Sequence, residues 1–204
     1  MLFQNRVQPT GDIIIDHARG DFIGNRGIIH RNDQTLGTAR WSHQAWICCT
    51  LSWQDRKRPM MDGRNWTELF FLDEAVAMAA GHRPCGYCRR VDYVRFVDAW
   101  ADHAGMPPKA PQIDKALHAA RVLPCERTQQ RHFAPLRELP VGAMILRDET
   151  AYLVRRDAVL PYQRAQYGPP EIRDNDEAAT VLTPPPMLNV LRAGFLPALH
   201  VSAG

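Results

Sequence analysis

A Cys-x-x-Cys turn that follows a strand and a short helix constrains this chain more than any other feature. The segment 70–75, Phe-Phe-Leu-Asp-Glu-Ala, predicts a strand that leads into a helix capped by Asp73, and Gly81 predicts the end of that helix. Cys85 and Cys88 follow in a turn. Two thiolates three positions apart can bind one metal ion from a single turn, which is typical of half a structural zinc site. The remaining ligands must come from elsewhere in the chain.

The composition is that of an ordinary soluble globular protein. The 204 residues are 45% hydrophobic and 23% charged, enough for one large domain or two small ones. No run approaches the roughly 20 apolar residues of a membrane span, and the N-terminus lacks the apolar stretch of a signal peptide. We therefore expect a cytoplasmic protein without a membrane partner. The five cysteines are an odd number, which favours metal binding or redox chemistry over a disulfide framework.

The order of predicted elements indicates an α+β fold. A short-stranded sheet with a zinc-stapled strand, helix and turn is followed by a helical segment and a smaller C-terminal part that contains strands. We place the boundary between residues 1–138 and 139–204, with the second part able to pack on the first. Strands are predicted at 12–15, 28–30, 45–53, 66–72 and 181–183, and a hairpin at 143–155. Helices are predicted at 74–80, 89–104, 112–121, 129–137 and 187–193.

The upstream metal ligands are sought among the residues near the strand 45–53. Cys48 and Cys49 are neighbours on this strand and point to opposite faces, so only one of them should reach the metal. His43 and His30 are further candidates for the remaining positions. The more apolar face of the strand carries Ile47, Cys49, Leu51 and Trp53.

The pattern Phe-x-x-Asp-Glu-Ala-x-x-x-Ala-x-Gly-x-Arg-Pro-Cys-x-x-Cys resembles the second half of the zinc-binding domain of the Ada alkylation-response protein family. The matching residues are Glu74, Ala75, Gly81, Arg83, Pro84, Cys85 and Cys88. The resemblance covers about residues 70–90 and implies that the two cysteines bind Zn²⁺. In that family the other ligands are commonly a Cys or His followed four residues later by a Cys. This chain departs from the pattern, because His43 lies five residues before Cys48.

The family's chemistry is not carried over with its half-motif. In the Ada protein a zinc thiolate accepts a methyl group from a DNA phosphotriester, but the nucleophile segment has no match here. A redox role for the two cysteines is a further alternative, as is a turn without metal. The redox version of Cys-x-x-Cys usually opens a helix of a thioredoxin-like pattern, whereas here it follows a helix and a proline.

Arginine dominates the basic residues and suggests a nucleic-acid partner. The net charge is only +3, but 22 of the 25 positive residues are Arg, the better bidentate partner for phosphate. Genomic base composition is the competing explanation for this bias. The candidate phosphate contacts are Arg56, Arg58, Arg83, Arg89 and Arg90, and the candidates for base stacking are Trp41, Trp46, Trp66 and Tyr87. We expect a zinc-containing protein that associates with nucleic acid, DNA rather than RNA, in DNA repair or its regulation.

Two alternatives remain open from the sequence. The Gly-rich segment Asp16–His30 contains His17, Arg19 and His30, which could form the site of a hydrolase or a nucleic-acid-processing enzyme. No signature selects a reaction, so the sequence leaves open whether the protein is an enzyme. The chain could also be a zinc-stapled protein-interaction module. Its oligomeric state has no sequence signature.

Overall fold

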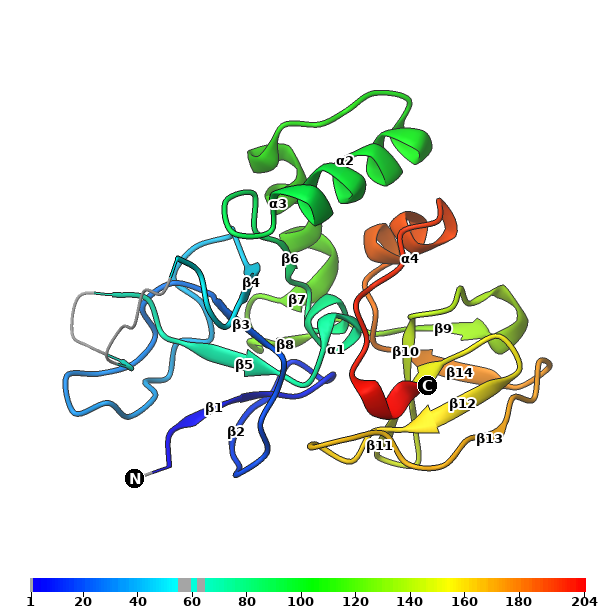
Figure 1. The fold of residues 1–204 in the computed structure, drawn as a ribbon, viewed down its shortest axis with the longest axis horizontal. Coiled ribbons are helices and arrows are strands. Elements are labelled where there is room, and N and C mark those ends of the chain that lie inside the picture. The colour runs from blue at the N-terminus through cyan, green and yellow to red at the C-terminus, as the bar shows by residue number, and fades with distance from the viewer. Residues whose placement is uncertain (1, 55–59, 62–64) are drawn as a thin grey trace.

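The computed structural model describes residues 2–54, 60–61 and 65–204 and confirms the α+β fold. Figure 1 shows a first sheet and a second sheet on either side of helix α1 (Glu74–Ala79), with helices α2 and α3 above the first sheet. No helix in the described part of the chain is long and apolar enough to span a membrane.

The first sheet brings the upstream cysteines beside the Cys-x-x-Cys turn. Its strands are β1 (Gln4–Val7), β2 (Ile13–Ile15), β3 (Phe22–Asn25), β4 (Ile47–Thr50), β5 (Leu69–Phe71) and β6 (Arg83–Pro84), in the order β2-β1-β5-β3-β4-β6. The predicted strands near residues 12–15, 45–53 and 66–72 are thus present in shorter form. Between 28 and 30 there is only an isolated bridge, from His30 to Leu36.

Helix α1 lies at the centre of the molecule, and all six of its residues are buried. Asp73 caps it as predicted, since one carboxylate oxygen accepts a hydrogen bond from the Val76 amide at 2.9 Å. The other oxygen accepts from the Tyr167 hydroxyl at 2.9 Å and the His200 amide at 3.1 Å. The cap of α1 therefore also holds the C-terminal region against the first sheet.

The second sheet begins before the expected boundary at residue 138. Its strands are β9 (His132–Pro135), β10 (Met144–Arg147), β11 (Thr150–Val154), β12 (Ala158–Pro161), β13 (Glu171–Ile172) and β14 (Ala178–Val181), in the order β13-β12-β11-β10-β14-β9. Strands β10 and β11 form the predicted hairpin. One hydrophobic cluster contains residues of both sheets, including Leu69, Phe71, Met144 and Leu153, so the two parts share a core.

The helix expected at 129–137 is wrong. The segment instead forms β8 (Thr128–Gln129), which pairs with β7 (Val122–Leu123), and then β9, which pairs with β14 along four residues. Pro135 ends β9 and lacks the amide proton that a helix interior needs. Only a short 3₁₀ turn follows, at Leu136–Glu138.

The remaining helices agree with the sequence to within a few residues. They are α2 (Arg90–Ala104), α3 (Ala110–Arg121) and α4 (Pro185–Arg192), followed by a 3₁₀ turn at Val201–Ala203. Helix α4 packs against α2 and α3. Phe96 of α2 and Phe195, which follows α4, lie edge to face with ring centroids 5.7 Å apart. These contacts hold α2 in place, and the N-terminus of α2 directly follows the Cys-x-x-Cys turn.

Candidate metal centre

Three cysteine sulfurs from two distant segments meet at one point. The Sγ atoms of Cys49, Cys85 and Cys88 all lie within 4.8 Å of one another. Zn–S bonds of about 2.3 Å in a tetrahedral site place two sulfurs about 3.8 Å apart, so a small contraction accommodates the ion. Among the residues described, no fourth Cys, His, Asp or Glu joins this group.

Backbone pairing explains why these thiols converge. Strands β4 and β6 run parallel, with Cys48 opposite Pro84, and the Cys85 amide donates to the Cys48 carbonyl at 2.9 Å. The turn is closed by the Arg89 amide, which donates to the Cys85 carbonyl at 3.2 Å. The Tyr87 amide donates to Cys85 Sγ at 3.4 Å, an interaction that favours a thiolate at that position.

Cys48 lies on the opposite face of β4 from Cys49. Its side chain is buried in the core beneath α1, where Arg89 Nη1 donates to its sulfur at 3.5 Å. Burial raises the pKa of the Cys48 thiol. His43 is exposed and outside the thiol group, and Cys125 is exposed beside β8. The structure therefore brings Cys49, and neither Cys48 nor His43, to the turn.

The three thiols share protons in the absence of metal. Hydrogen bonds from Cys49 and then Cys88 lower the pKa of Cys85 to about 2, with smaller help from backbone amides. The same contacts with Cys85 and Cys88 raise the pKa of Cys49 strongly. One thiolate is thus stabilised by two thiols. A divalent cation would displace the shared protons and offset two of the three thiolate charges, which would leave a net charge of −1 on the centre.

A large cavity, which we call the cysteine cavity, lies directly over the thiols. Its volume is about 680 Å³, within the range typical of ligand pockets. Its aromatic lining consists of Trp53, Trp66, Phe70 and Tyr87, and its aliphatic lining includes Ile23, Ile47, Leu51 and Met60. The more apolar face of β4 therefore borders the cavity instead of the core. Tyr87 is 62% exposed, and its ring lies edge to face with Trp53 at 5.7 Å.

Glu68 is a polar residue of this cavity that the sequence did not single out. Its Oε2 accepts a hydrogen bond from the Met61 amide at 2.7 Å, while Oε1 is buried with no partner among the described residues. Asn25, also buried, lies on the same wall. The sequence could have indicated Glu68, because it is a charged residue within the otherwise largely apolar segment 66–72, and glutamate is rarely buried without a partner.

The arginines near the turn occupy different environments. Arg83 is buried and forms a bidentate pair with Asp114 at 2.7 and 2.8 Å. Arg89 is buried in an ion pair with Glu74 at 2.7 Å. Their guanidinium groups thus face protein carboxylates, whereas Arg90 is exposed. Arg56 and Arg58 lie outside the described residues.

The residues of the alternative enzyme site lie in unlike surroundings. His30 is buried, and its Nδ1 lies 2.6 Å from the Thr67 hydroxyl. His17 and Arg19 are exposed, and Arg19 borders a shallow pocket with Asp16 and Arg164.

Comparison with known proteins identifies no family. No family model matches the chain, and neither the curated proteins nor the solved structures contain a significant match. The resemblance to the Ada zinc domain therefore stays a prediction that rests on the motif of residues 70–90.

Proposed function

We propose that Cys49, Cys85 and Cys88 bind one Zn²⁺ ion whose fourth coordination position opens onto the cysteine cavity. The observation that carries this proposal is the convergence of three sulfurs within 4.8 Å on the wall of that cavity. Zinc fits better than harder cations because three thiolates form a soft donor set, and it needs no redox partner. Three protein ligands and one open position are the pattern of reactive zinc sites, whereas closed sites have four.

The neighbouring β4 cysteines provide a matched test of this proposal. Cys49→Ala should abolish stoichiometric zinc, while Cys48→Ala removes an equivalent thiol from the other face and should retain it. Cys125→Ala controls for an exposed thiol. Zinc is counted by mass spectrometry of the purified chain under native conditions. Equal zinc loss in the Cys48 and Cys49 variants, both folded by circular dichroism, would argue against the assigned ligands.

We further propose that the cavity binds bases of single-stranded nucleic acid. Aromatic rings on its wall offer stacking surfaces that accept any base. The exposed Arg90 follows the metal turn, and in the sequence a basic segment containing Arg56 and Arg58 follows Trp53. Together they supply the positive charge that a phosphate backbone requires. Arg83 and Arg89 contribute indirectly, by holding the turn through their ion pairs.

Binding is tested with a single-stranded oligothymidylate and tryptophan fluorescence at two salt concentrations. Quenching that weakens as salt rises supports the proposal, as does weaker binding by Arg90→Ala. Arg137→Ala, which changes an exposed arginine of the 3₁₀ turn at Leu136–Glu138, is the matched charge control. No quenching at low salt would remove the nucleic-acid assignment and leave a zinc site with a small-molecule cavity.

Glu68 favours a second candidate function, metal-assisted hydrolysis. A carboxylate with one unpartnered buried oxygen in the same cavity as an open metal position could accept a proton from a water molecule and return it to a leaving group. Glu68→Gln keeps the acceptor for the Met61 amide and removes the base. The variant should retain zinc and lose hydrolysis of p-nitrophenyl acetate. Equal rates for both proteins would exclude Glu68 as the base.

A further inference from the structure

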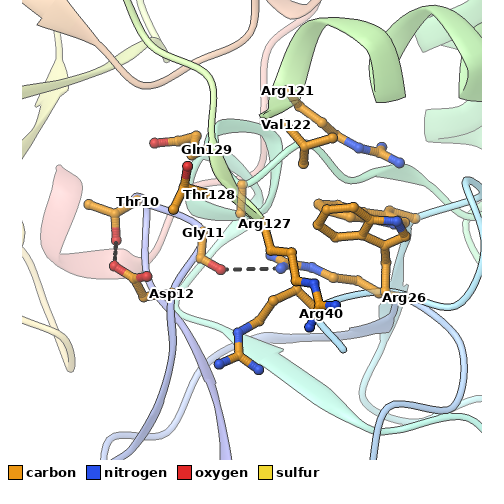
Figure 2. A pocket seen from close by; sticks show the side chains of 13 residues that line it. Thr10, Gly11, Asp12, Arg26, Arg40, Arg121, Val122, Arg127, Thr128 and Gln129 are labelled. Carbon is orange, nitrogen blue, oxygen red and sulfur yellow. Dashed lines mark hydrogen bonds between the residues drawn. The ribbon is translucent and has the colours of Figure 1, made fainter. Parts of the chain in front are cut away.

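A second pocket, lined by residues outside the strands of the first sheet, contains four arginines. Figure 2 shows Arg26, Arg40 and Arg127 on one side of it and Arg121 on the other. We call it the arginine pocket. Its remaining wall comes from residues 10–12, the two indoles Trp41 and Trp46, and the strands β7 and β8. It leaves about 40 Å³ for the centres of water-sized molecules, about three times what one water needs.

The two inner arginines of this pocket are buried, and neither forms an ion pair with a carboxylate of the described residues. Arg26 is 2% exposed and Arg121 is 1% exposed. Both stack on the ring of Trp46, with guanidinium carbons 4.1 and 3.7 Å from the ring centre. No carboxylate of the described residues comes within 4 Å of any of the four guanidiniums. Buried charges are normally paired, so this arrangement is incomplete.

The hydrogen bonds of Arg26 leave one donor unused. Its Nε faces His82 Nε2 at 3.3 Å and its Nη1 donates to the Gly11 carbonyl at 3.2 Å, as the dashed line in Figure 2 shows. Its Nη2 is buried and has no hydrogen-bond partner in the part of the chain that the structure describes. Burial lowers the pKa of Arg26 to about 9 and that of Arg121 to about 8. An anion in the pocket would supply both the missing acceptor and the missing charge.

We infer that the arginine pocket is a binding site for a compact oxyanion, namely a phosphate group. Arg26 provides a fixed donor at the base, because Trp46, His82 and Gly11 hold its guanidinium in place. Arg40 and Arg127 form the rim and donate to backbone carbonyls, and no carboxylate of the described residues neutralises their charges. Planar guanidiniums that converge in this way match the geometry of phosphate oxygens.

Asp12 is the one acidic residue of the lining and opposes an anion. Its side chain is exposed and accepts a hydrogen bond from the Thr10 hydroxyl at 2.7 Å. Replacing it should therefore strengthen binding, whereas replacing a rim arginine should weaken it. This pair of opposite expectations separates a real anion site from a general salt effect on stability.

The test titrates inorganic phosphate and methyl phosphate against chloride at constant ionic strength, with thermal unfolding and calorimetry as readouts. We expect saturable stabilisation by phosphate, affinity about tenfold weaker for Arg127→Gln and Arg40→Gln, and affinity a few-fold tighter for Asp12→Asn. The rim residues are used because a buried Arg26 variant can fail to fold. Arg137→Gln, which changes an exposed arginine of the 3₁₀ turn at Leu136–Glu138, should bind as the parent does.

Stronger binding of inorganic phosphate would indicate the free ion as ligand, and stronger binding of methyl phosphate a phosphate ester. The proposal is overturned if phosphate stabilises all variants equally, since phosphate also strengthens burial by exclusion from protein surfaces. It is equally overturned if calorimetry detects no binding to the parent protein. Neither result depends on the zinc centre, because all the residues tested lie outside the cysteine cavity.

Discussion

The cysteine cavity and the arginine pocket differ in how they are built. Trp46, the residue just before strand β4, lines the arginine pocket, whereas Ile47 and Cys49 of the strand line the cysteine cavity. The cavity combines neutralisable thiols with an apolar, partly exposed wall. The arginine pocket combines two almost fully buried guanidinium groups, those of Arg26 and Arg121, with the more exposed ones of Arg40 and Arg127. The first site gathers three sulfur ligands for a metal ion, and the second gathers guanidinium groups that form no ion pair with a carboxylate of the described residues.

The largest effect is expected from breaking the metal centre. Cys85→Ala should release zinc and lower the unfolding temperature by about 10 °C or more, because structural zinc contributes folding free energy directly. Chelation of the parent protein should reproduce the shift, and Cys125→Ala should not. The measurement is calorimetric unfolding with and without chelator. Unfolding temperatures that do not respond to the chelator would mean that the centre adds no stability.

The next largest effect is expected from breaking the ion pair of Arg83, a buried arginine that has a carboxylate partner, in contrast to Arg26 and Arg121. Asp114→Ala leaves Arg83 buried without its partner and should cost about 3–5 kcal/mol of unfolding free energy. Urea denaturation measures this loss. The double variant Asp114→Ala, Arg83→Met should recover part of it, because the orphaned charge is gone. A single variant as stable as the parent would show that this fold tolerates lone buried guanidiniums, and the argument for an anion beside Arg26 would weaken.

A smaller effect is expected at the mouth of the cysteine cavity. Tyr87→Ala removes a ring that is mostly exposed and should weaken oligothymidylate binding by about 1–3 kcal/mol while zinc content is unchanged. Fluorescence titration gives the affinity. Tyr87→Phe, which keeps the ring, is the matched control. Equal affinity for the alanine variant and the parent would place the nucleic acid elsewhere.

The smallest effect concerns pH and the arginine pocket. Burial, helped by Arg26 and Arg121, holds the pKa of His82 well below its ordinary value of about 6.5. Folding thus favours the neutral ring. Its contribution to stability is complete above pH 6.5 and falls as pH drops below that value, by up to about 1.4 kcal/mol per pH unit.

Unfolding temperatures of the parent and His82→Gln between pH 8 and pH 5 isolate this contribution, because both proteins share the pH dependence of the zinc thiolates. The parent should lose more stability than the variant below pH 6.5. Parallel curves would mean that His82 does not resist protonation.

Local sequence patterns predicted the elements of the metal centre better than they predicted its surroundings. Asp73, Gly81 and the Cys-x-x-Cys turn determine their own backbone, so α1 and the turn follow from short-range rules. The alternation of side chains along a strand predicts that Cys48 and Cys49 point to opposite faces. It does not predict which of the two faces the Cys-x-x-Cys turn. That choice depends on the parallel pairing of β4 with β6, which joins segments some 35 residues apart.

The arginine pocket had no local signature. Its residues come from five separate segments (10–12, 26, 40–46, 80 and 121–129), and only tertiary packing brings Arg26 and Arg121 to one indole. Gly81 has one role that the sequence predicts and one that it does not. Its positive φ of +83° ends α1, and its missing Cβ makes room for Arg121, whose Cδ would lie 2.3 Å from a Cβ at this position. The prediction of a helix at 129–137 was wrong for a similar reason. The segment forms β9 because it pairs with β14, and a pattern of neighbouring residues does not reveal a partner strand so far along the chain.

X-ray absorption at the zinc edge of the purified protein tests the central claim most directly. Binding by Cys49, Cys85 and Cys88 predicts three sulfur neighbours at about 2.3 Å and one lighter neighbour at about 2.0–2.2 Å. Cys48→Ala should leave that spectrum unchanged, and Cys49→Ala should lose the three-sulfur shell. A shell of four sulfurs, or a protein without zinc, would contradict an open three-thiolate centre.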